Sequence, residues 1–205
     1  MTGIKFFSLS ADSTQVSNIA GECAALLKID SCVGLIPTET VYGLVCRWND
    51  QNAYEKIWKI KKRPKDKKFQ MLALSVADAE KFGFVPDVRA RNLLDSFSPG
   101  PLTVISRSSF GGSIGLRIPS NAFSRAVLSG IRCPLAATSA NISGAKDFSG
   151  FGPILSSLAG TPDFAVDAGL VDGCPSTVVD LSGSEIRILR HGKISEKMIL
   201  EAISK

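Results

Sequence analysis

Two polar stretches of this sequence carry residue types that could bind an anion. Thr38-Glu39-Thr40 follows the apolar run 33–36 and a proline, so two hydroxyls and a carboxylate stand where a buried strand should end. Ligands of α/β proteins commonly bind at such strand ends. Further along the chain, the basic run 59–68 contains seven lysines and arginines and one aspartate. We expect the fold to bring these two stretches together around one ligand.

The positive charge of the chain is concentrated in this basic run. The 205 residues include 24 lysines and arginines and 19 acidic residues, a net charge of +5. The run contributes +6 (7 − 1), so the rest of the chain, with 17 basic and 18 acidic residues, sums to −1. A local patch of this kind favours one anionic ligand or one docking surface. The structural alternative is a solvated helix end followed by a loop, where the helix dipole also favours lysines.

Other polar side chains are expected where further strands end. They are Arg117, Thr138, Ser139, Asn141, Ser176, Thr177 and Arg190. Arginine binds a carboxylate or a phosphate through two parallel hydrogen bonds. Hydroxyls and arginines on several strands, close to a basic run, therefore suit an anionic small molecule. The alternative is that the hydroxyls cap helices and the arginines lie on the surface.

Several common catalytic and ligand-binding sites need residues or motifs that this chain lacks. His191 is the only histidine and the five cysteines form no C-x-x-C pair, so neither a zinc site nor a Ser-His-Asp triad is expected. The sequence has no P-loop and no convincing G-x-G-x-x-G motif. Scattered cysteines in odd number are typical of reduced thiols in a cytosolic protein. No apolar run approaches a membrane span, and the first residues lack the blocks of a signal peptide.

Helical and extended patterns alternate along the chain, which predicts an α/β fold with one mixed sheet and flanking helices. We predict helices over 13–29, from Asp50 to before Pro64, and over 75–82, 86–97, 120–129, 154–158 and after Ser195. Strands are predicted over 32–36, 41–46, 71–74, 102–105, 114–118, 135–138, 164–166, 177–181 and 186–189. Gly130 should close the helix 120–129, and residues 145–152 should be mobile. Without a linker or repeat, residues 1–205 are predicted to form a single domain.

Five motifs in a fixed order point to a family. They are Pro37-Thr38-Glu39-Thr40-Val41-Tyr42-Gly43-Leu44, Lys61-Lys62-Arg63-Pro64, Pro99-Gly100-Pro101-Leu102-Thr103, Gly115-Leu116-Arg117-Ile118-Pro119 and Thr138-Ser139-Ala140-Asn141-Ile142-Ser143-Gly144. A weaker tail consists of Pro175-Ser176-Thr177-Val178-Val179 and Ile188-Leu189-Arg190. With these motifs, nearly the whole chain resembles the YrdC family of threonylcarbamoyl-AMP synthases, in its short, single-domain form (TsaC type).

The resemblance implies a fold and a reaction. The fold would be a twisted α/β sheet with a basic concave face. L-threonine, bicarbonate and ATP, with Mg²⁺ carried on the ATP, would give threonylcarbamoyl-AMP and pyrophosphate. A tRNA-modifying transferase partner of the TsaD type would then use the product to modify the adenosine beside the anticodon. The resemblance also implies a cytoplasmic enzyme of the nucleotidyltransferase class, with weak tRNA binding as an option and no metal site of its own.

The resemblance also implies roles for individual residues. Lys61 and Arg63 would hold the ATP phosphates as the catalytic pair, helped by Lys65 or Lys67. The rest of the nucleotide site would consist of Ser113, Ser139, Asn141 and Arg190. L-threonine would contact Thr38, Arg117 and Ser176, with Arg117 on its carboxylate. Glu39 is either a general base or the cap of a turn.

The chain departs from the family pattern in two stretches, and other functions remain open. Residues 65–72 lack the histidine that many members have there, and residues 145–149 lack the usual Pro, Ser and Thr. One alternative is a non-catalytic RNA-binding module that uses the basic run, although only Trp58 and Phe69 are aromatic in that region. Another alternative is the related carbamoyltransferase domain of hydrogenase maturation, which takes carbamoyl phosphate.

Overall fold

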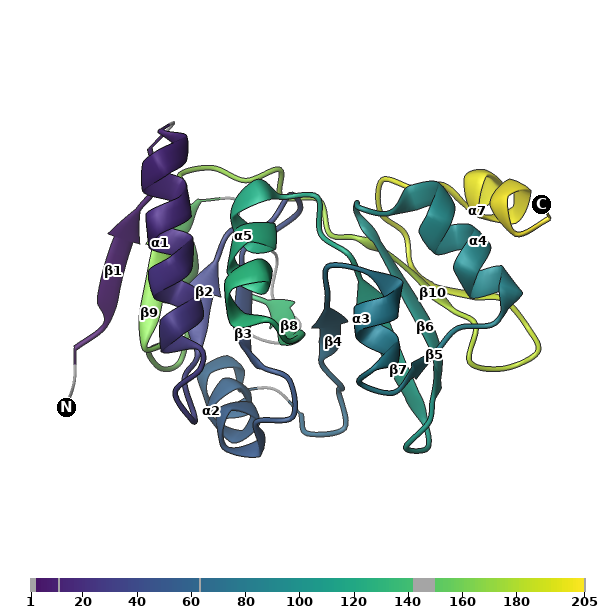
Figure 1. Ribbon diagram of the computed structural model, residues 1–205, viewed down its shortest axis with the longest axis horizontal. Coiled ribbons are helices and arrows are strands. Elements are labelled where there is room, and N and C mark those ends of the chain that lie inside the picture. The colour runs from purple at the N-terminus through teal and green to yellow at the C-terminus, as the bar shows by residue number, and fades with distance from the viewer. Residues whose placement is uncertain (1–2, 11, 63, 142–149, 205) are drawn as a thin grey trace.

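A computed structural model of the protein describes residues 3–10, 12–62, 64–141 and 150–204 (Figure 1). The helices are α1 (Ser13–Leu26), α2 (Gln51–Lys61), α3 (Val76–Glu80), α4 (Val88–Phe97), α5 (Ala122–Ile131), α6 (Phe151–Ser157) and α7 (Glu196–Ile203). The strands are β1 (Lys5–Ser8), β2 (Gly34–Ile36), β3 (Gly43–Arg47), β4 (Gln70–Leu72), β5 (Phe84–Val85), β6 (Leu102–Ser108), β7 (Ser113–Arg117), β8 (Leu135–Ser139), β9 (Phe164–Asp167), β10 (Thr177–Asp180) and β11 (Arg187–Arg190).

All of these strands belong to one sheet that mixes parallel and antiparallel pairs. Its order is β1-β9-β2-β3-β8-β4-β7-β6-β10-β11, and β5 pairs with β6. The order departs strongly from the sequence, since β9 lies between β1 and β2 and is parallel to both. The predicted class, a mixed twisted sheet with flanking helices, is confirmed.

The two halves of the sheet are covered differently. In the half formed by β1, β9, β2, β3 and β8, which we call the double-covered half, neighbouring strand residues pack on opposite layers. Val45 belongs to the core with α1 and α5, whereas Leu44 belongs to the core with α2 and α6. In the half formed by β4, β7, β6, β10 and β11, the single-covered half, Val104 packs with α4 and α7, while its neighbour Thr103 faces a cavity. Alternation of apolar and polar residues is what a sheet with one uncovered face requires.

Four of the helices begin after a polar residue whose side chain caps the first turn. Asp12, Asp50, Ser75 and Ser195 each accept a hydrogen bond from a backbone amide in the first turn of the helix that follows. Such caps satisfy amides that have no partner inside the helix.

Some predicted boundaries are wrong. Gly130 lies inside α5, which ends at Ile131, and the cap that follows is Arg132 in a left-handed conformation with φ 59°. Asp87 caps α4, so Pro86 precedes the helix and does not start it. The short strands β1 and β5 were not predicted, because four and two residues give little periodicity to detect. Most of the predicted mobile segment lies outside the described residues, while Phe151 and Gly152 form the first turn of α6.

Candidate functional site

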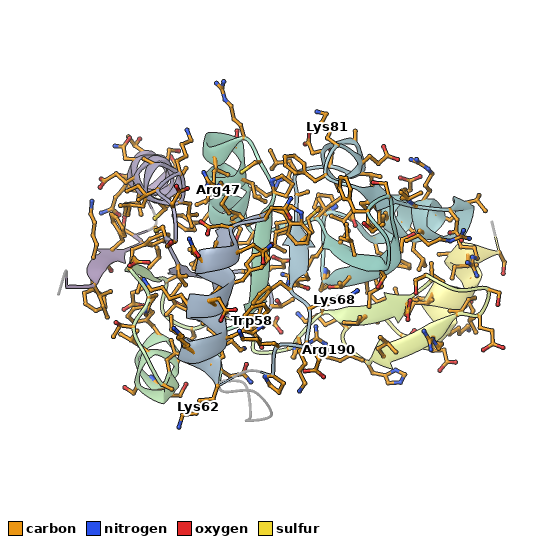
Figure 2. All side chains as sticks on the ribbon, turned by 90° about the horizontal axis from the view of Figure 1, so that it is seen from below. Arg47, Trp58, Lys62, Lys68, Lys81 and Arg190 are labelled. Carbon is orange, nitrogen blue, oxygen red and sulfur yellow. The ribbon has the colours of Figure 1, made fainter. Side chains whose placement is uncertain are left out.

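The uncovered face of the single-covered half contains a cavity of about 300 Å³, which we call the central cavity. Its wall is formed by Thr40, Val41, Lys68, Phe69, Gln70, Thr103, Ile105, Ser113, Gly115, Arg117, Ala137, Thr138, Ser139, Pro175, Ser176, Val178 and Arg190. Among the described residues, this wall has three cations and no carboxylate. Such a wall favours an anionic ligand. Figure 2 shows Lys68 and Arg190 on the side of the sheet away from α3 and α4.

Lys61 lies at the end of α2 and points into the protein. It follows Ile57 by four residues, so it lies on the buried face of the helix and is 1% exposed. Its Nζ donates to the backbone oxygen of Ser139 and lies 3.2 Å from Asn141 Oδ1. The Ser139 hydroxyl also donates to Asn141, over 2.6 Å. The helix thus holds a buried ammonium group against the end of β8, beside the central cavity.

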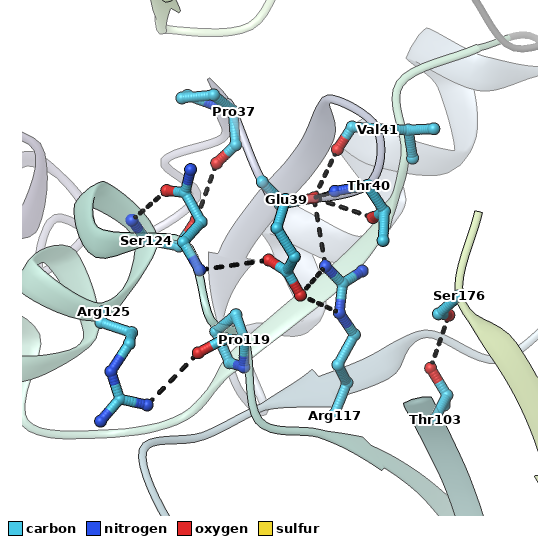
Figure 3. Close-up of polar contacts among 12 residues, drawn as sticks. Pro37, Glu39, Thr40, Val41, Thr103, Arg117, Pro119, Ser124, Arg125 and Ser176 are labelled. Carbon is cyan, nitrogen blue, oxygen red and sulfur yellow. Dashed lines mark hydrogen bonds and ion pairs between the residues drawn. The ribbon is translucent and has the colours of Figure 1, made fainter. Parts of the chain in front are cut away.

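Arg117, the last residue of β7, forms a buried ion pair with Glu39. Its Nη2 lies 2.6 Å from Glu39 Oε1, and the two side chains are 3% and 17% exposed (Figure 3). The same Nη2 also donates to Thr38 Oγ1 over 3.2 Å. The second carboxylate oxygen of Glu39 accepts from the amide of Asn121, the cap of α5, over 3.4 Å. The turn 38–40 therefore fixes the guanidinium in the cavity wall.

A chain of hydrogen bonds crosses the other side of the cavity. Arg190 donates to the backbone oxygen of Ser176 over 2.8 Å and to its hydroxyl over 2.9 Å. The Ser176 hydroxyl pairs with Thr103, which donates to Gln70. Gly192 makes this approach possible, because a Cβ there would lie 2.5 Å from the backbone of residues 175 and 177.

The structure brings many of the predicted site residues together. Ser113, Arg117, Ser139, Ser176 and Arg190 line the central cavity. Their individual roles stay predictions.

Four other predicted site residues do not line the cavity. Lys61 and Asn141 lie behind Ser139, and Thr38 lies behind Arg117. Lys65 lies elsewhere, in an exposed ion pair with Glu55, and lines a neighbouring cavity. Arg63 lies outside the described residues. The roles of these residues also stay predictions.

Three polar residues of the cavity wall had no role in the sequence prediction. They are Lys68, Gln70 and Thr103. Thr103 lies in a recognised motif and alternates with the buried Leu102 and Val104, so its position on the open face was readable from the strand pattern. Lys68 lies in the loop before β4 and belongs to the basic run that was expected near the ligand, but it had no role of its own in the prediction. Gln70 begins the three-residue strand β4, for which the sequence gives no comparable signal.

The described residues show neither a membrane-spanning helix nor a cluster of three or more potential metal ligands. None of the described helices is long and apolar enough to cross a bilayer. All five cysteines are unpaired, and three of them are buried. Burial raises the pKa of the Cys32 thiol to about 11, helped by the nearby Asp163, which keeps this thiol protonated at neutral pH.

Comparison with known proteins identifies relatives along nearly the whole chain. The family model Sua5/YciO/YrdC, described as telomere recombination, matches residues 30–192. A threonylcarbamoyl-AMP synthase of Bacillus subtilis is 30% identical over 207 aligned positions, covering 93% of this chain and 57% of that protein. YciO of Escherichia coli, which is named an uncharacterized protein, is 26% identical over 200 positions, covering 92% of this chain and 95% of YciO.

A solved structure gives the same result. The crystal structure of Pyrococcus abyssi Sua5 complexed with L-threonine superposes with a TM-score of 0.83 at 26% identity, and covers 98% of this chain and 61% of that one. This chain therefore spans less than two thirds of the Bacillus and Pyrococcus proteins. The chain is a mixed α/β protein with a cationic, hydroxyl-lined cavity on the open face of its sheet. Within that class, the chain belongs to the Sua5/YciO/YrdC family, and the predicted family is confirmed.

Proposed function

We propose that this protein is a threonylcarbamoyl-AMP synthase, which joins L-threonine, bicarbonate and ATP into threonylcarbamoyl-AMP with release of pyrophosphate. Two relatives support the proposal, the Bacillus enzyme by its name and Sua5 by its bound L-threonine. The observation that carries it here is the wall of the central cavity, where Arg117 and Arg190 face a space lined by hydroxyls. A carboxylate and a polyphosphate both need such cations.

ATP would bind near the end of α2, where Lys61 meets Ser139 and Asn141. Lys61 and Arg63 would hold the phosphates, with Ser113 and Arg190 along the rest of the nucleotide and Lys65 as a further phosphate contact. Fixed cations stabilise the charge that develops on the α-phosphate and on the leaving pyrophosphate. Mg²⁺ would enter bound to the ATP phosphates, since the described wall offers cations and hydroxyls and Mg²⁺ prefers carboxylates and phosphates.

L-threonine would bind at Arg117, with Thr38 and Ser176 nearby. The guanidinium has five N–H groups, and its three contacts with Glu39 and Thr38 leave donors for a substrate carboxylate. Bicarbonate would carboxylate the threonine amine with loss of water, and an oxygen of the carbamate formed would attack the α-phosphate, from which pyrophosphate leaves. Because a carbamate is already a nucleophile, the site's main task is to hold the carbamate in line with that phosphate. Glu39, which pairs with Arg117, would orient it and is not needed as a base.

The wider setting of the activity is part of the proposal. The enzyme would belong to the nucleotidyltransferases, with residues 1–205 acting as one domain in the cytosol. A basic concave face would guide the anionic substrates. A TsaD-type transferase would then transfer the threonylcarbamoyl group to the tRNA adenosine beside the anticodon.

The test is pyrophosphate release by the purified protein with ATP and Mg²⁺. We expect release only when both L-threonine and bicarbonate are present, and mass spectrometry should identify threonylcarbamoyl-AMP as the product. Omission of either substrate is the internal control. If the folded protein binds ATP but releases no pyrophosphate with both substrates, the proposed reaction is wrong.

A further inference from the structure

Gln70, the first residue of β4, lies in the floor of the central cavity between Ala137 of β8 and Gly115 of β7. Residues that pair across neighbouring strands lie on the same face of a sheet, and all three of these residues line the cavity. Alanine and glycine are the two smallest residues, so they leave space on both sides of the glutamine. The half-buried side chain of Gln70 therefore rises from a floor of small residues.

A chain of hydrogen bonds fixes the orientation of the Gln70 amide. The guanidinium of Arg190 can only donate, so the Ser176 hydroxyl oxygen accepts from it over 2.9 Å. Thr103 donates its single hydroxyl proton to Gln70 Oε1 over 3.0 Å. In the 2.9 Å contact between the two hydroxyls, Ser176 is therefore the donor and Thr103 the acceptor (Figure 3). The chain runs in one direction and ends on the carbonyl oxygen of Gln70.

This orientation leaves the amide nitrogen of Gln70 with two N–H groups for a ligand. Because Oε1 accepts from Thr103, the nitrogen on the same carbon points away from that hydroxyl. Within the described part of the chain, no residue accepts a hydrogen bond from this nitrogen. A neutral N–H group selects a neutral acceptor such as a hydroxyl oxygen, whereas the arginines of the wall attract anionic groups.

Apolar surface lies beside this donor. A Cβ added to Gly115 would lie 3.4 Å from Ile105 Cγ1 and 3.5 Å from the methyl carbon of Thr103. Ile105 and the Thr103 methyl group therefore border the space above Gly115, and Ala137 borders Gln70 on its other side. A hydrogen-bond donor next to a small apolar surface matches a side chain that carries one hydroxyl and one methyl group.

Arg117 lies at a suitable distance from this donor to hold the other end of a small amino acid. It follows Gly115 by two residues on β7, so both residues lie on the same face of the strand. Two residues along a strand span about 7 Å. An amino acid with its carboxylate on Arg117 and its side chain at Gln70 can cover this span with a hydrogen bond at each end.

We propose that Gln70 selects threonine by donating a hydrogen bond from its amide nitrogen to the side-chain hydroxyl of the substrate. The threonine methyl group would pack in the space above Gly115, against Ile105. Thr103 would be a positioning residue, because it acts on the substrate through the amide that it orients. The assignment rests on the proposed synthase function, since it takes L-threonine as the ligand of Arg117.

Calorimetric titration with free amino acids tests the proposal without ATP or catalysis. L-valine has a methyl group in place of the threonine hydroxyl and leaves the Gln70 donor unpaired, so it should bind at least about tenfold more weakly than L-threonine. L-serine lacks the methyl group and should also bind about tenfold more weakly. Equal affinities for L-threonine and L-valine would overturn the proposal.

Gln70→Leu removes the donor and keeps a side chain of similar size. The ratio of the dissociation constants for L-valine and L-threonine should fall by about tenfold in this variant, because neither ligand then finds a donor. Gln51→Leu is the matched control and should keep the native ratio, since Gln51 is exposed at the start of α2. Circular dichroism checks folding, and the ratio is insensitive to a uniform loss of binding.

Failure of this proposal is distinct from failure of the synthase function. An unchanged ratio in Gln70→Leu would exclude the hydrogen bond to the threonine hydroxyl. An ATP affinity that fell as far as the threonine affinity would also overturn the proposal, because Gln70 would then contact the nucleotide. If the ratio changes as expected but the native protein releases no pyrophosphate with all substrates present, the threonine pocket stands and the synthase reaction is wrong.

A second pair of variants tests the positioning role of Thr103. Thr103→Val keeps the shape but removes the hydroxyl that holds Gln70 Oε1, so the preference for L-threonine over L-valine should fall by about threefold, less than the loss of a whole hydrogen bond. Thr103→Ser keeps the hydroxyl and should retain the native preference. An equal loss of preference in both variants would overturn the positioning role.

Discussion

Lys61 and Lys65 stand four residues apart in the same basic run, yet the structure gives them opposite surroundings. Lys61 is 1% exposed and bound to the oxygens of Ser139 and Asn141, whereas the side chain of Lys65 is 65% exposed and paired with Glu55. The helix explains the difference, because α2 ends at Lys61 and continues its buried face up to that residue. Charge alone therefore does not tell which cations belong to a site. Arg117 resembles Lys61 in this respect, since it too is buried against fixed partners.

The largest effect is expected for Arg117→Ala. An unpaired substrate carboxylate loses on the order of 2 to 5 kcal/mol, so the KM for L-threonine should rise by at least about thirtyfold. The control is Arg125→Ala, whose guanidinium donates to Pro119 outside the cavity wall (Figure 3). Steady-state kinetics with varied threonine measures both. An unchanged KM for L-threonine would mean that Arg117 does not bind the substrate carboxylate.

Lys61→Met should produce the next largest effect. Hydrogen bonds to charged groups contribute about 1.5 to 3 kcal/mol, so pyrophosphate release should fall by roughly ten- to a hundredfold through a weaker ATP interaction. Lys59→Met on the same helix is the matched control, because Lys59 is exposed. ATP titration of the initial rate measures the effect. Equal rates in the two variants would contradict the distinction between buried and exposed lysines.

Asp180 provides an intermediate case, a buried carboxylate paired with an exposed arginine. Burial opposes its ionisation, but hydrogen bonds from Ser182 and the guanidinium of Arg187 outweigh that cost, so the pKa of Asp180 lies below its usual range. A lowered folded-state pKa adds stability above the unfolded value of about 3.9, and this stability is lost as the pH falls through the lower folded value. Asp180→Asn should therefore flatten the acid side of the stability profile. Urea titrations between pH 2 and pH 6 measure the free energy of unfolding of both proteins. Identical profiles would show that the Asp180–Arg187 pair does not contribute to stability in acid.

The smallest effect is expected for Lys65→Met on stability. An exposed ion pair contributes little, so the free energy of unfolding should change by less than about 0.5 kcal/mol. Urea denaturation at neutral pH measures this change, with Lys61→Met for comparison. If pyrophosphate release also fell as far as in Lys61→Met, Lys65 would have to reach the ATP phosphates despite its exposed position.

The helices were predictable from sequence because local signals define them. Asp50 and Ser195 show as caps, and apolar spacing shows the buried faces. The order of the strands was not predictable, since pairs such as β1 with β9 join residues far apart in the chain. The sequence indicated polar groups at strand ends, and Arg117 and Ser139 do end their strands. The site as a whole, however, extends over the open face of the sheet.

The cavity that Lys65 lines, with the rings of Trp48, Tyr54, Trp58, Phe69, Phe82 and Phe110 in its wall, shows why the rest of the molecule could not be predicted from the sequence. Its rings come from segments between Trp48 and Phe110 that carry no common motif. Similarly, the burial of Lys61 depends on where α2 packs, and the charge pattern of the basic run gives no information about that packing. The family motifs predicted most of the site residues. Only the structure shows which of them line the central cavity and which lie buried behind its wall.

The place of β9 in the sheet has a consequence for synthesis of the protein. β9 ends at Asp167 and separates β1 from β2, which come from the first 36 residues. During translation the double-covered half therefore cannot close until most of the chain has left the ribosome. Until then β2, which can already pair with β3, exposes the edge that β9 will occupy, and Leu35 and Ile36 lie on this strand. The nascent segment up to Ile36 thus exposes an apolar strand edge that can pair with another chain until β9 has been made.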